Sequence, residues 1–209
     1  MIKVLTWYGV RDWKDFEYFQ SGQTDTSQLR FSGIRGALYA GARSLLVRTC
    51  SEILAWYPSE NPGIITITRK EEPLRGVRWN LGSGLEKGYT VEESIRRAAE
   101  KEGGLKLEDE LVLLGPMMGF WEHGPMPSTP KGIQDFSLAV FGRAKKGQVK
   151  LDETSSDYHV LTEREFMKDR NTFHPYMQEF LPIAFDIGTG RLVIPEVGQQ
   201  VTTQPKRVN

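Results

Sequence analysis

Glu102 is the residue whose position in this sequence points most directly to chemistry. Residues 91–103 repeat their apolar side chains with the period of an α-helix, and steps of about 100° per residue put Val91, Ile95 and Ala98 on one face with Glu102 in its middle. A carboxylate on an apolar face must be paired or desolvated, and perturbed acids concentrate at functional sites. We therefore predict a functional carboxylate here. The alternative is that Glu102, in the last turn, bends out to solvent or caps a neighbouring loop.

Other residues near this helix could bind phosphates or bases. Arg69 and Arg78 precede it and could hold phosphate groups, although a solvated loop has the same composition. Trp79 and Trp121 could stack a nucleobase, with packing in the core as the commoner alternative. His123 could act as a base, because imidazole titrates near neutral pH; a plain surface histidine is the alternative.

Residues 81–105, LGSGLEKGYTVEESIRRAAEKEGGL, resemble the Nudix box, the signature of enzymes that cut nucleoside diphosphates linked to another group. The matching residues are Gly82, Gly84, Glu86, Gly88, Arg97, Glu102, Gly104 and Leu105. Three acids of the signature are replaced, by Tyr89, Ala98 and Lys101, and a cation at the last of these opposes metal binding. The resemblance implies Mg²⁺ or Mn²⁺ as cofactor, with Glu102 and the Gly82 carbonyl as ligands. Such a metal neutralises the charge of a pyrophosphate and activates a water.

Residues 134–166 resemble later strands of the same family and are most similar to the branch that hydrolyses GDP-mannose and related nucleotide sugars. That branch has a Gln-His pair where this sequence has Thr154 and Ser155. The nearby acids Glu153 and Asp157, with Asp152 as a further choice, are expected to complete the metal shell. His159, or His123, is the expected base.

The chain alternates between strand-like and helical segments. We expect strands over 45–47, 52–57, 64–68, 79–81, 135–143 and 158–161, and an edge strand over 192–194. Helices are expected over 90–103, 163–168 and 175–185, and a loop that covers a substrate over 115–132. A capping box of Thr90 and Glu93 starts the main helix, and Glu93 is also expected to pair with Arg97. This order predicts an α/β fold, the Nudix-type α/β/α sandwich with a mixed β-sheet.

The domain organisation follows from these segments. We expect one Nudix-like domain over residues 41–185, an aromatic N-terminal arm over 1–40 and a C-terminal extension over 186–209. The arm is rich in Trp, Tyr and Phe, so it is expected to pack on its own domain or on a second copy in a homo-oligomer.

Composition limits the partners and the location. The 27 basic residues balance 27 acidic ones, which gives no electrostatic reason to expect a nucleic-acid or membrane partner. No stretch approaches the roughly 18 apolar residues of a membrane helix, and the N-terminus does not resemble a signal peptide. The one cysteine, Cys50, excludes an intramolecular disulfide. We expect a cytoplasmic protein.

Two functions of different class remain. The first is a divalent-metal-dependent hydrolase of a nucleoside diphosphate derivative. The second is a catalytically inactive Nudix fold that serves as a binding or structural module in a larger assembly.

Overall fold

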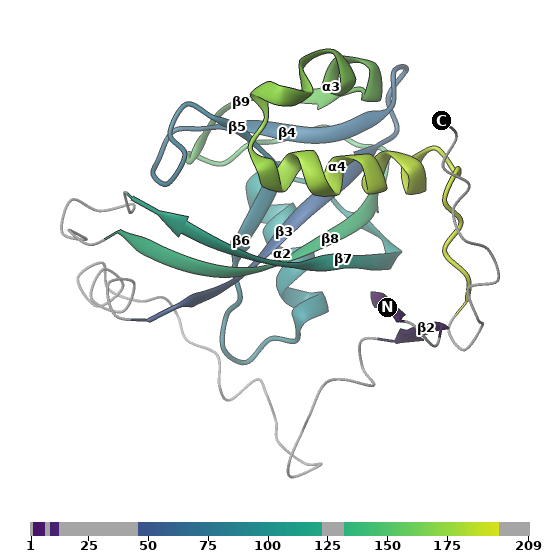
Figure 1. Cartoon of the computed structure of the whole chain (residues 1–209), viewed down its shortest axis with the longest axis horizontal. Coiled ribbons are helices and arrows are strands. Elements are labelled where there is room, and N and C mark those ends of the chain that lie inside the picture. The colour runs from purple at the N-terminus through teal and green to yellow at the C-terminus, as the bar shows by residue number, and fades with distance from the viewer. Residues whose placement is uncertain (1, 7–8, 13–45, 123–131, 197–209) are drawn as a thin grey trace, which may run out of the picture.

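The computed structural model describes residues 2–6, 9–12, 46–122 and 132–196 (Figure 1). Nine strands form one sheet in the order β2-β1-β7-β8-β3-β4-β5, with β6 paired to β3 and β9 to β4. The strands are β1 (Ile2–Thr6), β2 (Gly9–Asp12), β3 (Arg48–Tyr57), β4 (Gly63–Arg69), β5 (Arg78–Trp79), β6 (Leu81–Gly84), β7 (Leu107–Trp121), β8 (Ile133–Ala144) and β9 (Ser155–Leu161). The helices are α2 (Val91–Gly103), α3 (Glu163–Asp169), the 3₁₀ turn η3 (Arg170–Thr172) and α4 (Pro175–Gly188).

The sheet is mixed and is covered on both faces. β3 runs parallel to β8, and β1 runs parallel to β7, while the other pairs are antiparallel. Helix α2 packs its residues Ile95, Ala98 and Ala99 into one apolar cluster, and α4 packs into a second one. Alternate residues of β3 enter the two clusters, with Ile53 in the first and Leu54 in the second. The predicted α/β/α sandwich with a mixed sheet is confirmed.

Helix α2 begins and ends where its sequence predicts. Thr90 Oγ1 accepts the Glu93 amide at 3.2 Å, and the Glu93 carboxylate accepts the Thr90 amide at 2.8 Å, so the capping box is present. Gly104 ends the helix with φ of +65°, a conformation that glycine adopts without strain. Because Glu93 serves the cap, it does not pair with Arg97 as expected; Arg97 instead reaches Glu86 at 3.3 Å.

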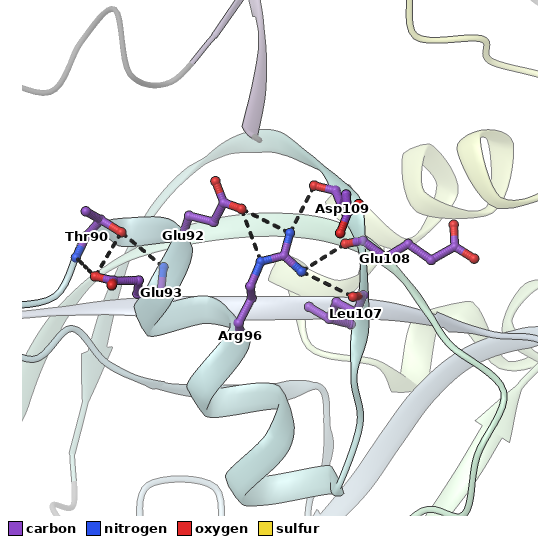
Figure 2. A network of polar contacts seen from close by, with 7 residues as sticks. All are labelled: Thr90, Glu92, Glu93, Arg96, Leu107, Glu108 and Asp109. Atoms are coloured by element: carbon purple, nitrogen blue, oxygen red, sulfur yellow. Dashed lines mark hydrogen bonds and ion pairs between the residues drawn. The ribbon is translucent and has the colours of Figure 1, made fainter.

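Arg96 ties this helix to the start of β7 (Figure 2). Its guanidinium donates to the backbone carbonyls of Leu107, Glu108 and Asp109 at 3.2, 3.0 and 2.9 Å. The same group pairs with Glu92 one turn earlier, at 3.0 Å. The five donors of a guanidinium suit such a fan of acceptors, and they fix the orientation of α2 on the sheet.

Three predicted segments differ from the structure. Residues 46–47 of the strand expected over 45–47 precede β3 and are not in a strand, and residue 45 lies outside the described residues. Residues 115–121 of the expected loop belong to β7, a strand that our prediction missed, and 123–131 lie outside the described residues. The expected strand over 192–194 is absent, because this segment runs irregularly and packs Leu192 and Ile194 against the second apolar cluster. Most of the expected arm, residues 13–40, also lies outside the described part, but β1 joins the sheet through β7.

Lys3 is a fully buried cation on β1. Its ammonium contacts Glu110 of β7 at 2.7 Å and Glu196, beyond α4, at 3.3 Å. Burial acts to lower the pKa of Lys3, but the hydrogen bonds and charges of the two glutamates outweigh it, and the pKa is raised. None of the described helices is long and apolar enough to cross a membrane.

Candidate active site

Gly82 of β6 lies between two carboxylates. Glu52 of β3 is its direct partner in the strand ladder. Its backbone N–H donates to Oε2 of Glu102, on α2, at 2.9 Å. A Cβ at this position would lie 2.6 Å from Oε2 of Glu52 and 2.7 Å from the carbonyl oxygen of Ser51. Only glycine therefore allows the Glu52 carboxylate to lie against this strand.

The Glu52 carboxylate is held by two side-chain donors. Oε2 accepts Nε1–H of Trp79 at 2.9 Å and Nδ2–H of Asn80 at 2.7 Å. Burial is the largest influence on this acid and raises its pKa from 4.5 to about 7, although both hydrogen bonds act to lower it. The nearby charge of Glu102 raises the pKa further.

Glu102 is 9% exposed and faces inward with the apolar residues of α2, as its helical phase predicts. Burial raises its pKa from 4.5 to about 7; the Gly82 hydrogen bond and the charges of Arg69 and Lys101 act to lower it. The alternative that it bends out to solvent is wrong. Its hydrogen bond to Gly82, however, agrees with the other alternative, in which Glu102 caps a neighbouring loop. The carboxylate therefore also holds the turn in place.

A pocket of about 220 Å³ opens beside this pair of acids. It is lined by Arg48, Cys50, Glu52, Arg69, Glu71, Glu72, Pro73, Leu74, Trp79, Gly82, Ser83, Lys101, Glu102, Trp121, Asp135 and Thr154. The lining thus combines carboxylates, three cationic side chains and two indole rings. This combination suits a ligand that carries both phosphates and an aromatic base, because cations bind phosphate and rings stack on bases.

Of the predicted substrate-binding residues, three line this pocket. Arg69 donates to the Pro73 carbonyl at 2.9 Å and acts electrostatically on both acids. Trp121 donates to Asp135 at 3.0 Å. Trp79 is only 2% exposed and stacks on Tyr176 with ring centroids 5.1 Å apart, so its faces serve the core. Arg78 is exposed and does not line the pocket.

Of the predicted residues from the acidic loop and β9, Glu153, Asp157 and His159 do not line this pocket. The charge of the further choice, Asp152, does reach Glu102 and acts to raise its pKa. Glu153 is exposed, and its carbonyl accepts Lys70 Nζ at 3.1 Å. Asp157 is exposed on β9. His159 contacts Glu165 at 3.1 Å. Strand β9 pairs with β4, and its residues 156–158 are exposed. His123 lies outside the described residues.

Sequence reasoning missed Glu52, and with it Asn80. The one signal was a charged residue at the start of a run that is otherwise apolar, Glu52–Tyr57. In a strand, neighbouring residues face opposite sides, so a glutamate in a buried strand must point into protein on one side or the other. An acid in such a strand is therefore a candidate functional carboxylate, as Glu102 is on its helix.

The fit of a divalent metal to this site is partial. Among the residues that the structure describes, no group of three or more His, Cys, Asp or Glu side chains is arranged to hold a metal ion. Two carboxylates do line one pocket. Mg²⁺ is commonly bound by one or two carboxylates, with water and substrate phosphates in its remaining positions. The donor set therefore fits a metal that arrives with a phosphorylated ligand and does not fit a cage made by protein alone.

Comparison with known proteins identifies the fold. No protein-family model matches the sequence, and no curated protein matches it. Among solved structures, an Ap4A hydrolase from C. elegans aligns over 69% of this chain and 99% of its own length, with 11% identity and a TM-score of 0.52. The NUDIX domain of Shewanella oneidensis NrtR, complexed with ADP ribose, aligns over 77% and 100%, with 9% identity and a TM-score of 0.51. A MutT protein from Methanosarcina mazei Go1 aligns over 69% and 98%, with 16% identity and a TM-score of 0.51.

These similarities concern the path of the chain, because the sequence identities are low. They agree with the observed mixed sheet and the helices that flank it. The chain therefore has a Nudix-type fold. The low identities leave the activity of the protein to be inferred from the residues of its pocket.

Proposed function

We propose that this protein is a divalent-metal-dependent hydrolase that cuts a nucleoside diphosphate linked to another group. The observation that carries the proposal is the buried Glu102 carboxylate at the glycine turn, in one pocket with cationic and aromatic side chains. A desolvated acid costs stability unless it is compensated. A cation and a phosphorylated ligand would compensate it.

The residues of the pocket divide by chemistry. Glu102 would hold Mg²⁺ or Mn²⁺, with the carbonyl of Gly82 as the second expected ligand. The metal, when bound, would neutralise the diphosphate and polarise a water. Arg69 and Arg48 would contact the phosphates as charged donors. Trp121, which is anchored through Asp135, would offer its ring to the base.

Three kinds of compound are candidate substrates. The sequence resemblance favours a nucleotide sugar such as GDP-mannose. The solved structures with the same fold include an Ap4A hydrolase and a domain complexed with ADP ribose. All three compounds contain phosphates bridged to a nucleoside, which is the chemistry that the pocket offers to bind. We also place the protein in the cytoplasm, and we keep an oligomer through residues 1–40 as a proposal.

A binding module without catalysis is the second candidate. It is favoured by Lys101, which lines the pocket at a position where an active box carries an acid. Arg97 also favours the binding module. Its guanidinium contacts Glu86 and lies 4.2 Å over the Tyr89 ring, so it is engaged in contacts at the surface of α2. Such a protein would bind the nucleotide and leave it intact.

One experiment separates these functions. The full chain is incubated with ADP-ribose, GDP-mannose and Ap4A, with Mg²⁺, with Mn²⁺ or with EDTA. Product is followed by chromatography and binding by calorimetry. Metal-dependent release of a nucleotide, abolished by Glu102→Gln and retained by Glu60→Gln at an exposed position, supports the hydrolase. Binding without release supports the module, and neither binding nor release by the wild type refutes both.

A further inference from the structure

We propose that Glu52, which lies outside the segment that resembles the Nudix box, is the second carboxylate of a divalent-cation site shared with Glu102. The inference rests on the proposed function for the phosphate oxygens that complete the metal's shell. In this proposal a strand residue takes over the metal binding that the replaced acids of α2 no longer provide.

The first support is geometric. The ladder between β3 and β6 fixes Glu52 opposite Gly82, and Glu102 bonds the N–H of that same glycine at 2.9 Å. The absent side chain of Gly82 leaves the space that the Glu52 carboxylate fills. Both acids line one pocket, and both carboxylates lie against the backbone of Gly82. Residues fifty positions apart in the sequence meet at one glycine.

The second support is the hydrogen bonding of the two acids. Trp79 and Asn80 both donate to Oε2 of Glu52, and Gly82 donates to Oε2 of Glu102. Within the described residues, Oε1 of each carboxylate accepts no hydrogen bond. Hard divalent cations take oxygen ligands, and one oxygen of each acid is thus held in place while the other is available to a ligand.

The third support comes from polar atoms beside Glu52 that lack partners. The Tyr176 side chain is 6% exposed, and its buried hydroxyl has no hydrogen-bond partner among the described residues. Its ring stacks on Trp79 with centroids 5.1 Å apart, and Nε1–H of Trp79 donates to Glu52. Oδ1 of Asn80, in a fully buried side chain, is also without a partner. Buried polar groups are nearly always bonded, and waters in the shell of a cation at Glu52 would donate to both of these oxygens.

The charges around the two acids suit a divalent cation that binds together with a phosphate. The charge of Arg69 acts on both acids and that of Lys101 acts on Glu102, and Arg48 also lines the pocket. These cations would repel a bare metal ion but attract the phosphates that accompany it. Arg69 and Lys101 are therefore placed to contact the anion, and Glu52 and Glu102 to contact the metal.

The test measures metal binding directly, with Mn²⁺ as the probe. Free Mn²⁺ is titrated by electron paramagnetic resonance against the full chain, with and without ADP-ribose. Glu52→Gln keeps the size of the side chain and an acceptor for Trp79, and Glu60→Gln is the matched control. We expect Glu52→Gln to weaken Mn²⁺ binding by about tenfold or more, as the loss of a metal-site group commonly does. Glu102→Gln should do the same, and Glu60→Gln should leave the affinity unchanged.

Thermal unfolding tells loss of a ligand from loss of the fold. Without metal, Glu52→Gln should melt at or above the wild-type temperature, because it removes a desolvated charge; with Mn²⁺ and ADP-ribose it should lose the stabilisation that the wild type gains. Should the variant unfold early, Glu52→Asp, which keeps the charge but shortens its reach, replaces it in the Mn²⁺ titration with the same expectation.

Three outcomes decide between the proposals. Unchanged Mn²⁺ affinity in the Glu52 variants, with loss in Glu102→Gln, overturns the role of Glu52 and leaves the proposed function standing. Mn²⁺ binding that needs Glu52, with no nucleotide bound or cut, supports the cation site and removes the proposed function. A wild type that binds no Mn²⁺ even with ADP-ribose overturns the cation site.

Discussion

The stability of this protein should fall as the pH rises from about 5 to 7, and Glu52 should be responsible for much of the fall. The pKa of Glu52 is raised by burial from 4.5 to about 7. Between these values the folded chain holds a proton that the unfolded chain has released. The stabilising effect of that proton is therefore complete below pH 4.5 and is lost as the pH rises through 7.

The size of the effect follows from the same values. One pH unit of difference between folded and unfolded pKa corresponds to about 1.4 kcal/mol, so the rise at Glu52 amounts to about 3 kcal/mol over the window. Glu102 has a similarly raised pKa and adds a contribution of the same sign. His174 acts oppositely, because burial lowers its pKa below 6.5 and its neutral form favours folding as the pH rises.

The assay is urea unfolding, followed by tryptophan fluorescence, at pH 5, 6, 7 and 8 without divalent metal. The comparison of the wild type with Glu52→Gln removes the contributions of His174 and other groups common to both. We expect the variant to gain up to about 3 kcal/mol on the wild type between pH 5 and pH 8. The wild type and Glu60→Gln should give parallel curves. If Glu52→Gln also parallels the wild type through the whole window, Glu52 is not a desolvated acid and our account of the site is mistaken.

Three further predictions concern individual contacts. Gly82→Ala should lower the unfolding free energy by about 1–3 kcal/mol, because its Cβ would lie 2.6 Å from the Glu52 carboxylate, whereas Gly147→Ala, with no atom nearer than 3.9 Å, should have little effect; chemical denaturation measures both. Arg96→Ala should cost about 1–3 kcal/mol by releasing three β7 carbonyls, Arg96→Lys should recover only part of this, and equal stability of all three proteins would show that the fan of bonds in Figure 2 contributes nothing. Lys101→Glu should tighten Mn²⁺ binding by about tenfold, worth about 1.4 kcal/mol, because it turns a cation of the pocket into an acid; weaker Mn²⁺ binding by electron paramagnetic resonance would contradict the placement of the metal.

The parts of this fold that sequence predicts are the ones set by near neighbours. The capping box at Thr90 and the inward position of Glu102 both follow from helical geometry over a few residues. The glycine turn, the three helices and strands β3, β4, β8 and β9 follow from residue type. These signals are local, and they were sufficient for the fold.

The site depended on contacts that local patterns do not contain. Glu52 meets Gly82 only through the register of β3 on β6, and register is set by the whole sheet. Strand β7 was taken for a loop because Gly115, Pro116 and Gly119 look like turn residues; its ladder shifts register between Leu113 and Gly115, just before the proline, where a bulge tolerates a residue without an N–H. Asp157 was expected at the metal because it is close in sequence to the acidic loop, yet its strand continues along the outer edge of the sheet.

The ion pairs of Lys3 have a consequence for the order in which the chain can complete its fold during synthesis. Lys3 leaves the ribosome 193 residues ahead of Glu196, its partner beyond α4. At about 5–20 residues per second, roughly 10–40 s pass between them. Throughout that interval the ammonium has, of its two partners among the described residues, at most Glu110, and burying it on β7 with one of them missing is costly. Docking of β1 on the sheet should therefore be a late event, one that waits for the segment after α4 to emerge.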